Sequence, residues 1–154
     1  MFSRYAVAIG VCFFFLLLSS VACAGPGNSA RTAGAAVTGS GTVKPPGIFT
    51  LGGEIDASSG KVPMQSLDTM KFTPNSLVKT RPNATIEIEL TNAGATVHNI
   101  VAPGMGLATA VNVNPRQKVT AILKAPGAAG TYPFWCNVPG HAEAGMIGQV
   151  VVSE

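Results

Sequence analysis

The stretch WCNVPGHAEAGMIG, residues 135–148, carries a cysteine, a histidine and a methionine with four residues between neighbours: Cys136, His141 and Met146. On an α-helix, positions five residues apart are rotated by roughly 140°, so the three side chains would point to different sides. On a continuous strand, five residues span roughly 16 Å and successive members of the trio would lie on opposite faces. The spacing therefore predicts a strand that ends near Cys136, followed by a compact loop that turns back at its proline and glycine residues.

Short apolar runs separated by Gly, Pro and Asn surround this stretch. The clearest is ATIEIEL, residues 84–90, in which Ile86, Ile88 and Leu90 fall on one side and two glutamates on the other, as in a half-buried strand. Further strands are expected at residues 76–79, 98–102, 117–124, 131–136 and 148–153, with one or two more between 48 and 72. Because no helical periodicity accompanies them, these runs predict an all-β domain, either a β-sandwich or a barrel.

The N-terminal residues 1–24 read as an export signal. Arg4 precedes an apolar run that ends at Leu18, which is short for a membrane span. Three outcomes are compatible with this segment: cleavage after Ala24, cleavage before Cys23 with a lipid attached to that cysteine, or retention as an anchor. Cleavage at either site leaves the protein on the extracytoplasmic, periplasmic face of the bacterial cytoplasmic membrane.

Residues 25–47 are rich in Gly, Ala, Ser, Thr and Pro and contain almost no bulky apolar side chains, so they predict a flexible tether. The folded domain is expected to cover residues 48–154. Charged residues make up only 11% of the chain, and the net charge of +3 is scattered along it. This distribution excludes a nucleic-acid-binding stripe.

Cysteine and histidine are scarce in the expected domain. The chain has three cysteines, of which Cys12 and Cys23 belong to the export segment, so Cys136 is the one thiol left for the domain. A lone cysteine is more often a small buried apolar residue than a ligand. The two histidines change this interpretation, since His141 lies in the Cys136 loop and His98 begins an apolar run where a strand should start. Two strands that end at the same edge would bring them together.

One thiolate, two imidazoles and one thioether form a set of soft and borderline donors that suits copper. Two histidines and a cysteine in a plane, with a distant axial methionine, are the arrangement of blue-copper electron-transfer sites. Zinc is the main rival metal, but a thioether ligand would be unusual for it. We therefore expect one copper ion per chain.

The runs GTYPFWCNVPGHAEAGMIGQVVV and NATIEIELTNAGATVHNIV resemble the cupredoxin family of small type 1 blue copper proteins, and the resemblance covers about residues 62–154. It implies a Greek-key β-sandwich with copper near one end. Within the family, the equal ligand spacings and the tethered export signal are most similar to the membrane-attached auracyanins. The ligands that the resemblance implies are His98, Cys136, His141 and Met146.

The resemblance implies an electron carrier. Four protein ligands leave no open position for a substrate, so we expect no enzyme activity. The expected role is to shuttle single electrons between membrane redox complexes or cytochromes, as a monomer attached to the membrane through its N-terminus. The alternative is a periplasmic copper chaperone or storage protein, because the same ligands bind copper whether or not electrons move.

Three further roles are expected around the site. Asn99, beside His98, is a candidate for hydrogen bonds that tie the two loops together. His141 is the expected exit for electrons. Trp135, which alternation would turn outward, is a candidate second route or docking residue. The apolar surface that relatives use to meet redox partners is expected to include Val138, Pro139, Gly140, Ala142 and Ala144.

Overall fold

The computed structural model describes residues 44–154. The expected export signal, its cleavage and lipidation sites and residues 25–43 of the expected tether lie outside the described residues. The described part contains strands β1 to β10 and one 3-10 helix, η1 (Pro103–Met105). None of the helical structure within it is long and apolar enough to cross a bilayer.

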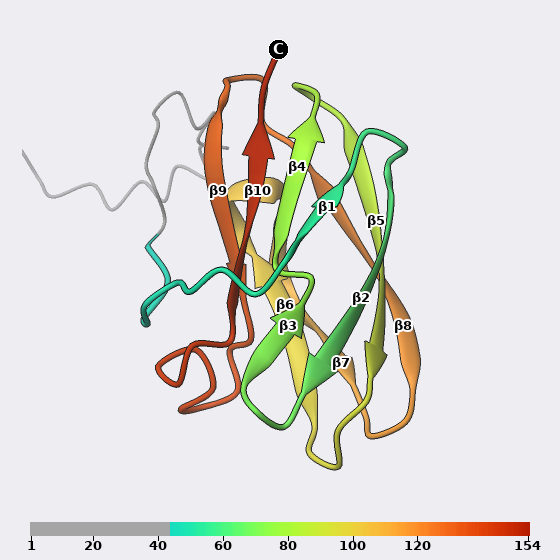
Figure 1. The fold of residues 1–154 in the computed structure, drawn as a ribbon, viewed down its shortest axis with the longest axis vertical. Coiled ribbons are helices and arrows are strands. Elements are labelled where there is room, and N and C mark those ends of the chain that lie inside the picture. The colour runs from blue at the N-terminus through green and yellow to red at the C-terminus, as the bar shows by residue number, and fades with distance from the viewer. Residues whose placement is uncertain (1–43) are drawn as a thin grey trace, which may run out of the picture. The chain divides into compact units, whose positions relative to one another are not determined.

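Two sheets pack face to face as a sandwich (Figure 1). In spatial order, the larger sheet contains β1 (Glu54–Asp56), β4 (Ser76–Thr80), β10 (Ile147–Val152), β9 (Gly130–Trp135), β6 (His98–Ala102) and β7 (Leu107–Val113). The smaller sheet contains β3 (Lys71–Thr73), β2 (Lys61–Leu67), β5 (Thr85–Asn92) and β8 (Lys118–Lys124). Strands distant in sequence lie side by side, as in a Greek-key arrangement. The predicted all-β sandwich is confirmed.

The core lies between the two sheets and follows the alternation of the strands. In β5, Ile86, Ile88 and Leu90 are 0% exposed, while the residues between them face outward. Across the core, the rings of Phe72 and Phe134 meet with their centroids 5.5 Å apart. Because a period-two pattern places alternate side chains on one face, this apolar face could be read from the sequence.

The strands agree with the sequence prediction except in two places. Strand β7 was not predicted, because its sequence LATAVNV buries fully only Val113 and shows no clean alternation. It lies at the edge of the larger sheet, where one neighbour is sufficient to hold it. The region between residues 48 and 72 holds three short or medium strands, β1 to β3, rather than one or two.

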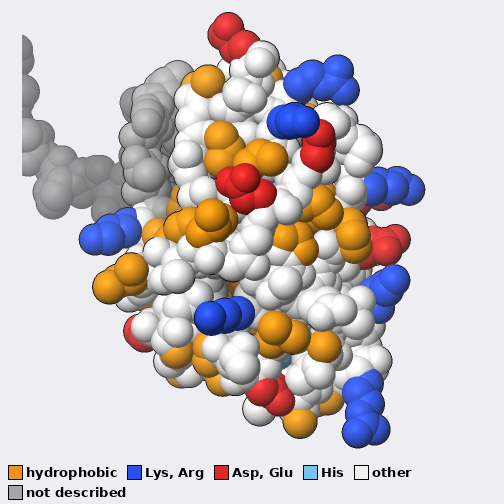
Figure 2. Space-filling view, in the orientation of Figure 1, with side chains coloured by type: hydrophobic (Ala, Val, Ile, Leu, Met, Phe, Trp, Pro, Cys, Tyr) orange, Lys and Arg blue, Asp and Glu red, His pale blue; other side chains and the backbone are white. Residues whose placement is uncertain are grey.

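Basic and acidic side chains are mixed on the surface of the smaller sheet. Figure 2 shows Lys and Arg side chains interspersed with Asp and Glu over the part of the molecule formed by β2, β5 and β8. Two ion pairs contribute, with Lys61 Nζ 3.8 Å from Glu87 and Lys118 Nζ 3.3 Å from Glu89. All four side chains are at least 44% exposed, so these pairs add little stability. On this face neither sign of charge forms a continuous stripe.

The segment that enters the domain, residues 47–52, is held by one buried side chain. Asn75 is 2% exposed. Its Nδ2 donates to the carbonyls of Thr50 at 2.8 Å and Ile147 at 3.1 Å, and its Oδ1 accepts from the Gly52 N–H at 2.7 Å. Asn75 thus joins the incoming chain to the first residue of β10.

We expect Asn75→Ala to lower the free energy of unfolding by about 2 kcal/mol, because it leaves the buried Ile147 carbonyl without a donor. Chemical denaturation of the full-length protein measures this change. Asn114→Ala, which removes only the exposed contact of Asn114 with Gln117, is the matched control and should change stability by less than about 0.5 kcal/mol. Equal effects of the two variants would contradict this role of Asn75.

Candidate metal centre

The loop of residues 136–146 joins two antiparallel neighbours, β9 and β10, whose last pair is Trp135 with Ile147. Its two ends are bonded directly, since the Cys136 N–H donates to the Met146 carbonyl at 3.1 Å. The Met146 N–H donates in turn to the His141 carbonyl at 2.9 Å. These two bonds bring Cys136, His141 and Met146 to one region in spite of their separation along the chain.

Turn geometry inside the loop makes this closure possible. Gly140 and Gly145 have φ values of 84° and 103°, in the region that residues with a side chain rarely adopt. The His141 N–H donates to the Val138 carbonyl at 3.0 Å, and the Gly145 N–H donates to the Ala142 carbonyl at 2.9 Å. The predicted compact loop after a strand that ends near Cys136 is therefore confirmed.

His98 reaches the loop from β6, of which it is the first residue. Strand β6 is antiparallel to β9, with Val101 opposite Trp135, so the beginning of β6 lies near the end of β9. This arrangement brings His98 to the same end of the larger sheet as Cys136, as expected from the sequence.

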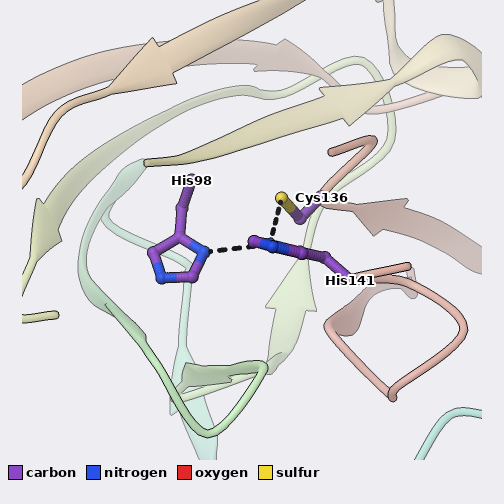
Figure 3. A group of neighbouring side chains, drawn as sticks. All are labelled: His98, Cys136 and His141. Atoms are coloured by element: carbon purple, nitrogen blue, oxygen red, sulfur yellow. Dashed lines mark hydrogen bonds between the residues drawn. The ribbon is translucent and has the colours of Figure 1, made fainter. Parts of the chain in front are cut away.

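Figure 3 shows the side chains of His98, Cys136 and His141 pointing toward one another. The Nδ1 atoms of His98 and His141 are 3.2 Å apart, and Cys136 Sγ is 3.5 Å from His141 Nδ1. The three donor atoms all lie within 4.8 Å of one another. His98 and Cys136 are 0% exposed, whereas His141 is half-buried.

The two shorter separations, 3.2 Å between the histidine nitrogens and 3.5 Å between Cys136 Sγ and His141 Nδ1, suit a single metal ion. Metal–nitrogen bonds of about 2.0 Å and metal–sulfur bonds of about 2.3 Å allow one ion to join donors up to roughly 4 Å apart. A thiolate and two imidazoles form the donor set that copper or zinc accepts. Met146 is 0% exposed, and its backbone is hydrogen-bonded to the backbones of both His141 and Cys136. Its thioether therefore belongs to the same buried region.

The protonation of His98 is set by burial and by one carboxylate. Burial lowers the pKa of His98. A hydrogen bond with Asp68 opposes this decrease, and Asp68 Oδ1 lies 3.3 Å from His98 Nε2. The pKa of Asp68 is itself held below its ordinary value, chiefly by hydrogen bonds from Ala95 and Thr96. A neutral imidazole is the form that a metal needs. Asp68 could not be predicted from the sequence, because it is 30 residues from His98 and belongs to no motif.

The thiol of Cys136 lies among apolar core residues. Burial raises its pKa, and hydrogen bonds from the backbone N–H groups of Asn99 and Val138 oppose the rise. The Asn99 N–H lies 3.4 Å from Cys136 Sγ. A metal cation would remove the proton that burial favours, because a coordinated thiol is deprotonated.

Asn99 ties the two halves of the site together. Its Oδ1 accepts from the Asn137 N–H at 2.8 Å, and its Nδ2 donates to Asn112 Oδ1 at 3.2 Å. From its place on β6, Asn99 thus links the strand that begins at His98 to the loop that contains Cys136, as expected from the sequence.

The expected apolar surface around His141 is only partly present. Pro139 and Ala144 are exposed and Val138 is half-buried, but Ala142 is only 2% exposed and cannot line a surface. Ala142 is covered because Gly47 packs so closely against its carbonyl that no side chain would fit at position 47.

Trp135 lies between the buried Phe134 and Cys136 and outside the core cluster, so it faces away from the core, as alternation predicts. It is half-buried rather than fully exposed. Val97, which precedes His98 in the chain, is an exposed apolar residue near the site, with 43% of its surface exposed.

Comparison with known proteins gives a family match. A family model described as copper binding proteins of the plastocyanin/azurin family matches residues 59–153. The copper-resistant cuproprotein CopI of Rubrivivax gelatinosus is 30% identical over 105 residues, which covers 55% of this chain and 61% of CopI. The chain thus spans less than two thirds of that relative.

Two solved structures share the fold. Reduced auracyanin from the photosynthetic bacterium Roseiflexus castenholzii is 23% identical with a TM-score of 0.51, and the match covers 62% of this chain and 98% of auracyanin. The blue copper oxidase of Nitrosomonas europaea is 21% identical with a TM-score of 0.52, and the match covers 60% of this chain and 38% of the oxidase. At these identities the likeness supports the fold alone.

We expect Asn99→Ala to weaken copper binding about tenfold, since it frees the Asn137 N–H and loosens the loop that carries Cys136. Competition with a chelator of known affinity measures this change. Asn112→Ala is the matched control, because it removes only the partner of Asn99 Nδ2. If Asn99→Ala binds copper as tightly as the control variant, Asn99 does not support the site.

Proposed function

The chain belongs to the plastocyanin/azurin family of copper-binding proteins, and from this membership we propose that it is a type 1 blue copper protein that carries single electrons. The observation that carries the proposal is the convergence of His98 Nδ1, His141 Nδ1 and Cys136 Sγ within 4.8 Å of one another. Met146, from the same loop, would be the fourth residue to hold the copper. When bound, copper supplies a one-electron couple between Cu(I) and Cu(II).

The protein's own part is to hold the donors still. The closing bond between Cys136 and Met146 continues the pairing of β9 with β10, so the loop is anchored to two strands inside the larger sheet. Donors that do not rearrange between oxidation states favour fast electron transfer. Four protein ligands leave no position for a substrate, which supports a carrier rather than an enzyme.

We propose that electrons leave through His141. It is the donor with partial exposure, whereas His98 and Cys136 are 0% exposed. The exposed Pro139 and Ala144 provide a small apolar surface beside it that another redox protein could approach, and the exposed Glu143 adds one negative charge there. The expected partners are membrane redox complexes or cytochromes.

The N-terminal sequence supports a location outside the cytoplasm for this activity. The apolar run after Arg4 supports export, and Cys23 supports lipid attachment to the membrane. A carrier that is tethered at its N-terminus as a monomer would stay close to membrane redox complexes.

A copper chaperone or storage protein is the second candidate. The observation that favours it is the 30% identity to a copper-resistant cuproprotein, CopI. The same donors bind copper in both roles, so the two functions differ in exchange. A carrier keeps its copper through many redox cycles, whereas a chaperone transfers it to an acceptor.

We expect the full-length protein to bind one copper per chain and to show an intense thiolate-to-copper absorption band that reduction removes. Metal analysis with visible and EPR spectra checks this, and Cys136→Ser should abolish the band. A protein that stays colourless after copper addition would contradict the proposal. Copper lost to a chelator within a few oxidation and reduction cycles would favour the chaperone.

Ala144→Glu should slow electron self-exchange between two copies by up to about tenfold at low salt, because each approaching surface would then carry a second negative charge beside the exposed Glu143. The effect should diminish at high salt. NMR line broadening in mixtures of reduced and oxidised protein measures the rate. Ile122→Glu, at a 59% exposed position on β8, is the control. Equal rates for the two variants would exclude this surface as the exit.

A further inference from the structure

The carboxylate of Asp68 contacts His98 on the side of the ring away from the other donors. His98 Nδ1 faces His141 Nδ1 at 3.2 Å. His98 Nε2 lies 3.3 Å from Asp68 Oδ1 and 3.2 Å from Thr96 Oγ1. The two ring nitrogens therefore have different neighbours, and only one of them points toward the group of donors.

Asp68 is held firmly in this place although its side chain is 43% exposed. Its Oδ2 accepts from the Ala95 N–H at 2.7 Å. Its Oδ1 accepts from the Thr96 N–H at 3.1 Å and from the Thr96 hydroxyl at 2.7 Å. These bonds join the turn after β2 to the loop before β6, and they fix the carboxylate beside the ring.

The direction of these bonds determines where the His98 proton lies. Because the Thr96 hydroxyl donates its proton to Asp68, its oxygen is left to accept from His98. The carboxylate can only accept. Both neighbours of His98 Nε2 are thus acceptors, so Nε2 carries the proton and Nδ1 keeps a free lone pair.

Gly94 makes the close approach of Asp68 possible. A Cβ at position 94 would collide with Asp68 Oδ1 and Cγ, so any larger residue there would displace the carboxylate. The backbone of Gly94 does not adopt a positive φ, which means that its lack of a side chain, rather than its conformation, is what the site requires.

We propose that Asp68 is a positioning residue that holds the proton of His98 on Nε2, directs the Nδ1 lone pair at the metal, and favours oxidised over reduced copper. The last effect is electrostatic: an anion beside the imidazole interacts more strongly with a metal of higher charge. Carboxylates bonded to the second nitrogen of a metal-bound histidine act in this way in other metal sites. This inference rests on the proposed copper site.

The first test needs no metal. In the metal-free full-length protein, the ¹⁵N chemical shifts of the His98 ring should show the Nε2–H tautomer as the dominant form. In Asp68→Asn the two tautomers should become mixed, because the side-chain amide can present a donor to Nε2. A wild-type ring protonated on Nδ1, or a variant with an unchanged tautomer, would overturn the positioning role.

The second test uses the copper-loaded protein. Asp68→Asn should weaken Cu(II) binding about tenfold relative to Cu(I). This ratio corresponds to a reduction potential raised by about 59 mV, which voltammetry measures. Asp56→Asn is the matched control: Asp56, the last residue of β1, is also an exposed carboxylate that accepts a backbone N–H bond, but its ion pair is with Lys79. A potential unchanged from the control would overturn the electrostatic role.

Gly94→Ala tests the same inference without removing a charge. It should displace Asp68 and raise the potential in the same direction as Asp68→Asn, whereas Gly104→Ala, where a Cβ meets nothing within 4 Å, should not. If the wild-type protein fails to bind copper, the proposed function fails while the tautomer test still stands. If copper binds with its expected spectrum and the Asp68 and Gly94 variants match their controls, only this inference fails.

Discussion

Closure of the loop between β9 and β10 is the constraint on which the rest of the site depends. The bond from the Cys136 N–H to the Met146 carbonyl, at 3.1 Å, extends the pairing of two strands that lie inside the larger sheet. The loop cannot open without breaking that pairing and exposing the buried Cys136 and Met146 to water. A short flexible segment thereby acquires the rigidity of the sandwich, and three donors that are spread along the chain share one location.

Around this closure, hydrogen bonds from the surrounding protein reach two of the donors, His98 and Cys136. Asn99 links the loop to β6 through the Asn137 N–H, and its own N–H points at the sulfur of Cys136. Asp68 meets the far side of His98. These contacts come from strand β6 and from the turn after β2. The fold therefore positions the ligand atoms, and in our proposal it also holds the His98 proton on Nε2 before a metal arrives.

The exposure of the three donor side chains distinguishes electron transfer from copper transfer, the two functions that such a site can serve. His98 and Cys136 are 0% exposed, and His141 alone of the three is half-buried, so the donors communicate with the surface through a single imidazole. An electron can pass through that ring without movement of the protein. Release of copper to an acceptor would require a new ligand to reach a buried metal, which favours the electron carrier over the chaperone.

The sequence by itself determined the features that depend on neighbouring residues. Alternation predicted β5, glycine and proline predicted the loop after Cys136, and the kinds of donor pointed to copper. Tertiary structure decided what depends on contacts across long separations. Asp68 meets His98 from 30 residues away, and the N-H of Gly52 meets Asn75 from 23 residues away. Strand β7 is held by its neighbour in the sheet rather than by its own apolar pattern. Such contacts leave no periodic trace in a single sequence, because their energy belongs to a pair of surfaces that only folding brings together.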